Sequence, residues 1–226
     1  MFNIFPISSK KAEAAPKAPS LPNVSNGQNI PPSEDIKVLY LSESELNAAK
    51  LKELVDIPDG AALIVGFVSP DLDVTSVANK IKREISTTTK LLLMTTAGEI
   101  CHQANKSSIY CEANDNRRKV LLQSFSNRMI EDLQIITVPL FAEDIRSNNV
   151  HTSVSERVSK IQHEIEKYKP KFRLSVNHTF ALIYADGLSN CETFVLQALY
   201  QLGRFPIPFG RRQCGRQLRF YSYLHL

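Results

Sequence analysis

The run AALIVGFV at Ala61–Val68 constrains the fold of this chain more than any other segment. Its apolar side chains do not alternate with polar ones, which is typical of a strand covered on both faces. An amphipathic helical pattern follows at 74–85, and a second buried strand is predicted at 91–95. Strand, helix and strand in this order predict two parallel strands joined by a crossover helix. The segment therefore indicates an α/β fold.

Further elements follow the same alternating order. A capping box of Ser153 and Glu156 precedes the clearest helix, and a second box, Ser189 and Glu192, precedes another. The predicted strands are 36–41, 120–125, 133–138 and 180–184, and the predicted helices are 43–54, 153–168 and one after 189. We expect a single α/β domain with a mixed β-sheet and flanking helices, and the order of the strands stays open.

Two terminal segments differ from the residues between them. Residues 8–34 are rich in Pro, Ala, Ser, Asn and Lys and have few large apolar side chains, so burial cannot offset the entropy of ordering them. We divide the chain into a flexible N-terminal extension at 1–35, a domain at 36–209 and an aberrant tail at 210–226.

The tail, GRRQCGRQLRFYSYLHL, is interpreted as an ending read out of frame. Each residue of the tail restricts the second base of its codon. When the reading frame is shifted by one position, these second bases become the first bases of codons that can encode VGGSAADNLDFTATFIY. That string contains a Gly-Gly-Ser-Ala turn and an alternating strand, which the tail lacks. This interpretation predicts a domain that is incomplete at its C-terminus, and a protein that is truncated and impaired.

The charge and the cysteines narrow the class of protein. The formal net charge of +4 comes from four arginines in a tail without acidic residues, so we expect no nucleic-acid partner. No apolar run is long enough to span a bilayer, and we expect no membrane association. The four cysteines form no CxxC pair and no disulfide framework. A reducing cytoplasm fits this composition.

One turn is crowded with residues that could take part in catalysis, namely Asp186, Ser189, Cys191 and Glu192. Nucleophilic catalysis needs a nucleophile beside an oriented base, and no nucleophile-elbow, P-loop or zinc-ligand spacing occurs. Turn formation and helix capping account for the cluster. We therefore predict that the chain is not an enzyme and holds no metal-ligand cluster.

Two strand ends carry the candidate ligand-binding residues. The TTAGE segment supplies Thr96 and Gly98, and the Asp-Gly-Leu-Ser turn supplies Asp186 and Gly187. Backbone donors at such strand ends can face a ligand. The alternative is that both segments are simple turns that end a strand.

Several ordered blocks resemble a known family. These blocks are LLLMTTAGE, VLLQSFSN, VPLFAEDIR and FALIYADGLSNCETFVLQALYQLGRFPIPF. They resemble the N-terminal half of FIST-domain proteins, which are bacterial signal-input modules, and within them the nitric-oxide-sensing haem proteins of the NosP type. The resemblance implies a sensory module that binds haem b and regulates a histidine kinase or a cyclic-di-GMP enzyme. The alternative is a FIST sensor that binds another small molecule, such as an amino acid, without haem.

Haem requires an axial side chain in an apolar pocket. Of the four histidines before the tail, His151 and His163 are predicted to be solvated and His178 to lie in a loop. His102 is therefore the candidate axial ligand. The alternative for His102 is an exposed loop histidine, because a single imidazole specifies no metal.

Overall fold

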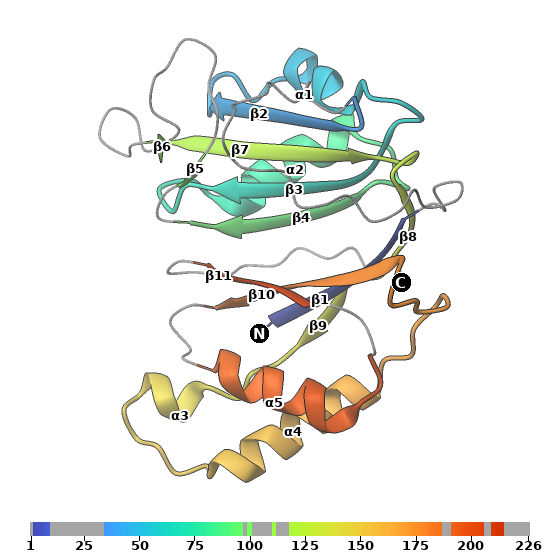
Figure 1. The fold of residues 1–226 in the computed structure, drawn as a ribbon. Coiled ribbons are helices and arrows are strands. Elements are labelled where there is room, and N and C mark those ends of the chain that lie inside the picture. Colours follow the sequence, from blue (N-terminus) through green and yellow to red (C-terminus); the bar gives the residue numbers. More distant parts are fainter. Residues whose placement is uncertain are drawn as a thin grey trace, which may run out of the picture.

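The computed structural model describes residues 2–9, 34–96, 99–100, 110–111, 118–186, 191–205 and 209–214. Side chains are described for 34–96, 118–185 and 191–205. These residues form two large β-sheets between two groups of helices and a separate pair of short strands, so the α/β class is confirmed (Figure 1).

The first sheet is the predicted mixed sheet. It has the order β2-β7-β3-β4, with bounds Ile36–Ser42, Lys119–Ser126, Ala61–Val68 and Lys90–Thr95. Strands β3 and β4 are parallel, as the strand–helix–strand order predicts, and β7 is antiparallel to both of its neighbours. The continuous apolar run is confirmed as the inner strand β3.

Helices α1 (Ala48–Val55) and α2 (Val74–Glu84) cover one face of this sheet. In α2 the side chain of Asp73 accepts hydrogen bonds from the backbone N–H groups of Thr75 and Ser76, which caps the helix. Helix α1 begins at Ala48 instead of residue 43. Its N-cap is Asn47, and the Glu45 carboxylate accepts a 2.8 Å bond from the Ser42 N–H in the turn before it.

Ser124 ties α1 to the sheet. Its hydroxyl donates a 2.7 Å hydrogen bond to the carbonyl of Leu54 in the last turn of α1, where carbonyls lack helical partners. We expect Ser124→Ala to lower the free energy of unfolding by about 1 kcal/mol, because a buried acceptor loses its donor. Urea unfolding measures this. The exposed Ser44→Ala should leave the midpoint unchanged, and an equal loss in both variants would contradict the assignment.

The second sheet was not predicted from the sequence. Its order is β11-β10-β1-β8, and β9 also pairs with β1. The strands are β1 (Phe2–Ser9), β8 (Ile130–Leu133), β9 (Ile136–Val138), β10 (Thr179–Asp186) and β11 (Phe209–Cys214). The single strand predicted at 133–138 is wrong, because the chain leaves the ladder at Gln134. The amide of Gln134 instead bonds the backbone of Lys169 and Lys171.

Both terminal segments contribute strands to this sheet. Strand β1 lies within the predicted N-terminal extension, ahead of the low-complexity residues on which that prediction rests, and it pairs with β10, β8 and β9. Strand β11 includes the first residues of the predicted tail and pairs with β10 in parallel from Phe209 to Cys214. The expectation that a core strand is lost after residue 209 is therefore wrong for this edge, because these backbone groups complete a ladder.

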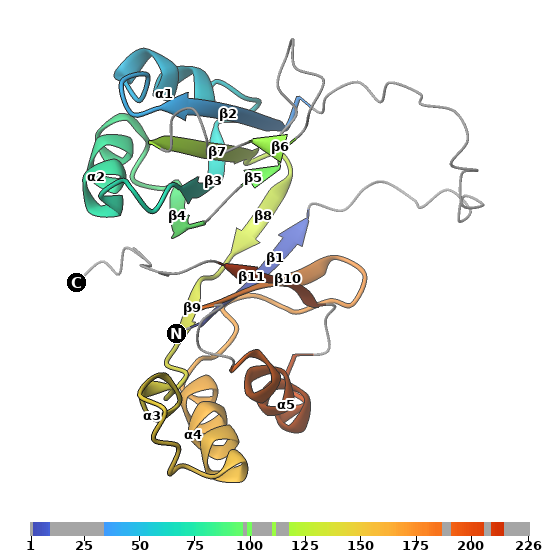
Figure 2. The ribbon, with the colours of Figure 1, turned by 90° about the vertical axis from the view of Figure 1, so that its left-hand side faces the viewer.

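Helices α3 (Glu143–Arg146), α4 (Val154–Glu166) and α5 (Glu192–Leu202) lie beyond the second sheet. Figures 1 and 2 show them on the opposite side of the molecule from α1 and α2. Helices α4 and α5 run parallel. Arg157 lies against Phe194 near the two N-termini, and Gln162, five residues after Arg157, bonds Gln201, seven residues after Phe194. Their N-termini therefore lie at the same end.

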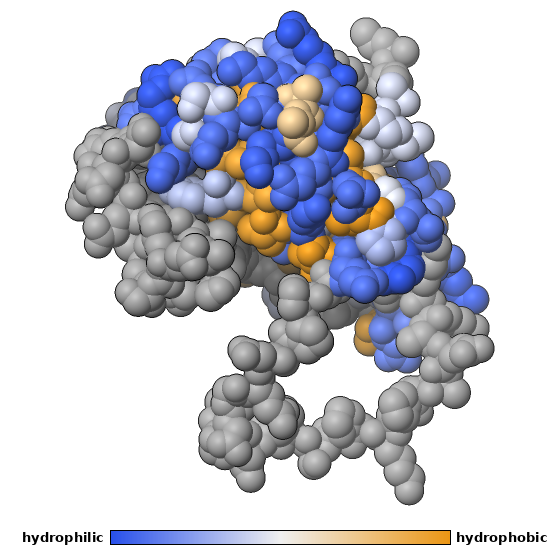
Figure 3. All heavy atoms as spheres, turned by 90° about the horizontal axis from the view of Figure 1, so that it is seen from above, coloured by the Kyte–Doolittle hydropathy of each residue, from blue (hydrophilic) through white to orange (hydrophobic). Residues whose placement is uncertain are grey.

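The two sheets meet through an apolar layer. Leu63, Val65, Leu92 and Met94 of the first sheet pack with Ile130 and Tyr184 of the second. Toward the edge strand β2 this packing thins, and Val38 is 45% exposed. Figure 3 shows a mainly hydrophilic surface with a hydrophobic area among the polar residues. The layer thus joins the sheets mainly through β3 and β4.

Candidate functional site

The two predicted ligand-binding segments lie at the same side of the molecule. Strands β3, β4 and β10 all run toward the left in Figure 1. Met94 of β4 and Tyr184 of β10 pack in one cluster between the sheets, and Thr96 and Asp186 each follow two residues later. Ligands in α/β proteins commonly bind outside the carboxyl ends of strands. We call this region, beyond Thr95 and Asp186, the strand-end edge.

The structure describes some of the predicted residues and not others. Thr96 is half-buried, and its N–H donates a 3.1 Å bond to the carbonyl of Val68. Asp186 is the last residue of β10 and pairs with Cys214. Gly98, Gly187 and His102 lie outside the described residues. His102 falls between β5 (Glu99–Ile100) and β6 (Tyr110–Cys111), which pair antiparallel within the predicted irregular excursion.

The remaining histidines that precede the tail are described. His151 and His163 are exposed, as predicted, and His178 is half-buried. The Nδ1 atom of His151 lies 2.9 Å from the carbonyl oxygen of Asn149. None of the three is buried in an apolar pocket, so His102 stays the candidate axial ligand by prediction.

The structure tests one of the two predicted capping boxes. Ser153 is the N-cap of α4, and its hydroxyl accepts a 3.2 Å bond from the N–H of Glu156, as predicted. Helix α5 instead begins after Cys191, a buried residue whose side chain makes no capping hydrogen bond. Ser189 lies outside the described residues. Cys191 thus occupies the N-cap position of α5, and the predicted cap by Ser189 stays a prediction.

A buried ion pair stands beside this helix end, and sequence reasoning missed it. The Nη2 atom of Arg157 in α4 donates to both carboxylate oxygens of Asp144 in α3, at 2.7 Å each. Asp144 also accepts the backbone N–H of Thr152 at 3.1 Å. The Arg157 hydrogen bond holds the pKa of Asp144 far below its ordinary value of 3.8, and the Thr152 bond adds to this. In the sequence, Arg157 lies among the apolar positions 154, 158 and 161 of the helix stripe. A charged residue at such a position was the only sign in the sequence that this residue is buried and needs a partner.

Two buried polar atoms of the described residues have no partner, and they lie on opposite sides of the pair of sheets, Thr95 on the side of α2 and Arg157 on α4. Within the described part of the chain, the Nη1 atom of Arg157 and the hydroxyl of Thr95 are buried side-chain atoms with no hydrogen-bond partner. Arg157 is 1% exposed, and its guanidinium carbon lies 5.8 Å from the ring centroid of Phe194 in the first turn of α5. Thr95 ends β4 directly before Thr96. Buried polar atoms are normally bonded, so each has donor capacity to offer.

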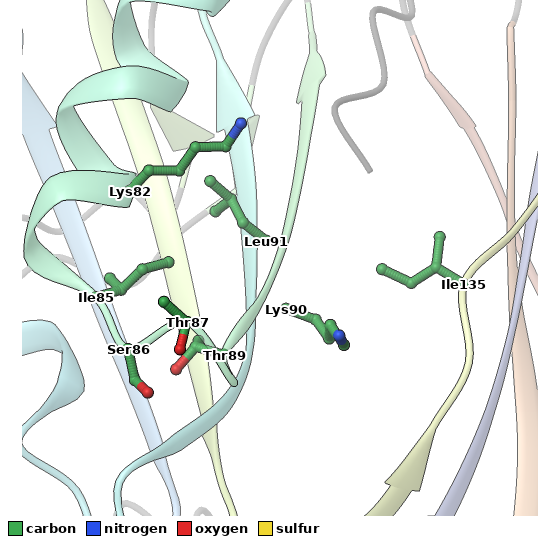
Figure 4. Close-up of a pocket in the computed structure, with 8 residues that line it drawn as sticks. All are labelled: Lys82, Ile85, Ser86, Thr87, Thr89, Lys90, Leu91 and Ile135. Atoms are coloured by element: carbon green, nitrogen blue, oxygen red, sulfur yellow. The ribbon is translucent and has the colours of Figure 1, made fainter. Parts of the chain in front are cut away.

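A cavity of about 150 Å³ lies at the opposite end of β4. Its lining is Lys82, Ile85, Ser86, Thr87, Thr89, Lys90, Leu91 and Ile135. Figure 4 shows Lys90 directed toward the side of Ile135 and Lys82 lying over Leu91, so the two ammonium groups do not converge. The Thr89 hydroxyl already donates to the carbonyl of Ala61 at 2.7 Å. No predicted site residue lines this cavity, which accommodates only a small molecule.

Comparison with known proteins agrees with the ordered sequence blocks. The model of the FIST N domain matches residues 62–221, which include both strand ends, the ion pair and most of the tail. No curated protein and no solved structure matches the chain. In the part of the chain that the structure describes, no helix is long and apolar enough to cross a membrane. The match covers most of the chain, and the chain therefore belongs to the FIST N domain family, whose members are sensory domains of signal transduction.

Proposed function

We propose that this chain is a ligand-binding sensory module that binds haem b, responds to nitric oxide and regulates a histidine kinase or a cyclic-di-GMP enzyme in the cytoplasm. The resemblance of the TTAGE and DGLS blocks to NosP-type proteins supports the haem part. The structural observation that supports a ligand site is that β4 and β10, the strands that lead into these two blocks, end on the same side of the molecule.

Haem uptake tests the gas-sensor part. The purified chain, mixed with haem, is expected to show a Soret band that shifts when nitric oxide is added. His102→Ala should remove or shift this band, because the axial ligand is lost. His163→Ala, an exposed histidine on α4, is the matched control and should behave as wild type. A missing Soret band, or equal spectra for both variants, would remove haem or His102 from the proposal.

The second candidate is a small-molecule sensor without haem. The cavity of about 150 Å³ favours it, because pockets that enclose larger organic ligands span roughly 300–1,000 Å³. An amino acid is the size of ligand that this proposal predicts. Amino acids that raise the melting temperature of the haem-free protein would support it, since a ligand that binds only the folded state stabilises that state.

A changed reading frame in the tail is a separate proposal. The FIST match extends to residue 221 and gives it no support. Resequencing the gene across the codons for residues 205–226 decides the matter. An extra or missing base would establish the frame change and make the functional protein a longer sensor, whereas a confirmed read would remove the frame change.

A further inference from the structure

The cavity at the start of β4 lies along an edge of the first sheet. Strand β4 is the last strand of its sheet, and no described strand pairs with its outer side. The Thr96 N–H bonds the Val68 carbonyl of β3, so by alternation the backbone groups of Leu91 point away from β3. Leu91 also lines the cavity. Its N–H group is therefore a hydrogen-bond donor at this edge without a strand partner in the described part of the chain.

The side chains of the cavity add donors but no acidic group. The Lys90 ammonium is directed toward the side of Ile135 (Figure 4), and Lys90 forms no ion pair with another described residue. Thr87, in the turn before β4, presents an exposed hydroxyl. The described lining includes two lysines and neither aspartate nor glutamate. The polar part of the cavity therefore matches an anionic group.

The rest of the lining is largely aliphatic. Ile85 follows α2, Leu91 belongs to β4, and Ile135 comes from the link between β8 and β9 in the second sheet. The volume of about 150 Å³ is that of a cavity that encloses one benzene ring. The body of the ligand is therefore a short apolar group, and the whole ligand has about six or seven heavy atoms.

We infer that this cavity binds a small monocarboxylic acid. Its apolar body contacts the three aliphatic side chains, and its carboxylate accepts hydrogen bonds from the Lys90 ammonium and the Leu91 N–H, of which the first is charge-assisted. An amino acid of the same size fits less well, because its own ammonium group would meet the charge of Lys90 without an acidic partner in the lining. The inference rests on the second candidate function, the small-molecule sensor, and names the chemical class of its ligand.

Three molecules with the same branched carbon chain test this inference. Isovalerate carries only the carboxylate, valine adds an ammonium group, and isovaleramide has no charge. We expect the amide signals of Leu91 and Ile135 in the ¹⁵N-labelled full chain to shift along a saturating curve in sodium isovalerate. Valine and isovaleramide should bind at least several-fold more weakly, and sodium chloride at the same ionic strength should cause no such shift. Equal binding of isovalerate and isovaleramide, or tighter binding of valine, would overturn the inference.

Two variants locate the site in the cavity. Lys90→Gln removes the cation, and we expect isovalerate affinity to fall by about three- to fivefold, to the level of isovaleramide. Ile135→Phe fills the cavity and should weaken both ligands while the spectrum stays dispersed. If Ile135→Phe does not fold, Lys90→Gln still tests the site, because it leaves the apolar walls unchanged. Lys52→Gln, at an exposed position on α1 outside the cavity lining, is the matched control. Equal isovalerate curves for wild type and Lys90→Gln would contradict the site.

The outcomes also separate this inference from the proposed functions. Isovalerate binding without a Soret band would remove the gas-sensor function and leave the cavity site standing. If valine raises the melting temperature and isovalerate does not bind, the small-molecule function stands and the carboxylic acid is wrong. If neither molecule binds while haem is taken up, the gas-sensor function stands and the inference falls.

Discussion

Replacing Asp144 with alanine is expected to destabilise the protein more than any other single change that we predict. The guanidinium of Arg157 is 1% exposed and would lose its carboxylate partner. A buried cation left unpaired costs about 3–5 kcal/mol, although the intact pair itself adds little net stability. Urea unfolding should therefore show a much lower midpoint for Asp144→Ala.

An exposed pair on the same helix provides the matched control. Glu156 and Lys160 lie 2.8 Å apart with both side chains about half exposed, so Glu156→Ala should change the midpoint little. Similar losses for Asp144→Ala and Glu156→Ala would show that the burial of Arg157 carries no special cost.

The same ion pair predicts a pH dependence. Because the pKa of Asp144 is lowered in the folded state, its contribution is present in full above the unfolded pKa of about 3.8. It is lost progressively as the pH falls below that value and the carboxylate is protonated. We expect Asp144→Asn to remove this part of the acid dependence of the free energy of unfolding. If the free energy of unfolding falls equally with pH in wild type and variant between pH 5 and pH 2, Asp144 does not contribute to the acid dependence.

The second large effect is expected at Gly66, in the middle of β3. A Cβ atom there would overlap the Cδ2 atom of Leu93 and lie 2.8 Å from the Cδ2 atom of Leu122. Both leucines are fully buried, so neither can move into solvent. We expect Gly66→Val to lower the free energy of unfolding by the upper part of about 1–3 kcal/mol, the usual cost of overpacking.

A second position on the same strand controls for the change to valine. Ala62 is half-buried, so Ala62→Val has room for its added methyl groups and should cost less. Both variants are compared by urea unfolding. If Gly66→Val unfolds at the same urea concentration as wild type, then β3, β4 and β7 are not closely packed at this point.

The first sheet could be predicted from the sequence because its strands and crossover helix are local patterns. Each of these patterns predicts which of its own residues are buried, as in the run at Ala61–Val68 and in the helical stripe of Val74, Val77 and Ile81. The second sheet could not be predicted, because β1 joins β10 across most of the chain. No local pattern records a pairing over such a distance.

The candidate site divides in the same way. Thr96 and Asp186 were identified because each follows an apolar strand, and strand direction then brings these ends to one side. The ion pair of Asp144 and Arg157 was missed, because a charged residue on an apolar helix face does not name its partner. An unpartnered Nη1 atom is a property of packing alone, and no sequence pattern could reveal it.

The central position of β1 has a consequence for how the chain folds during synthesis. The first sheet is complete in sequence once residue 126 has left the ribosome. Strand β1 emerges first but pairs Phe2 with Ala185, so it waits until β10 has been made. Contacts of such high sequence separation form slowly. We therefore expect the first sheet to form early and the second to close last, with β1 open to chaperones or to a neighbouring chain in between.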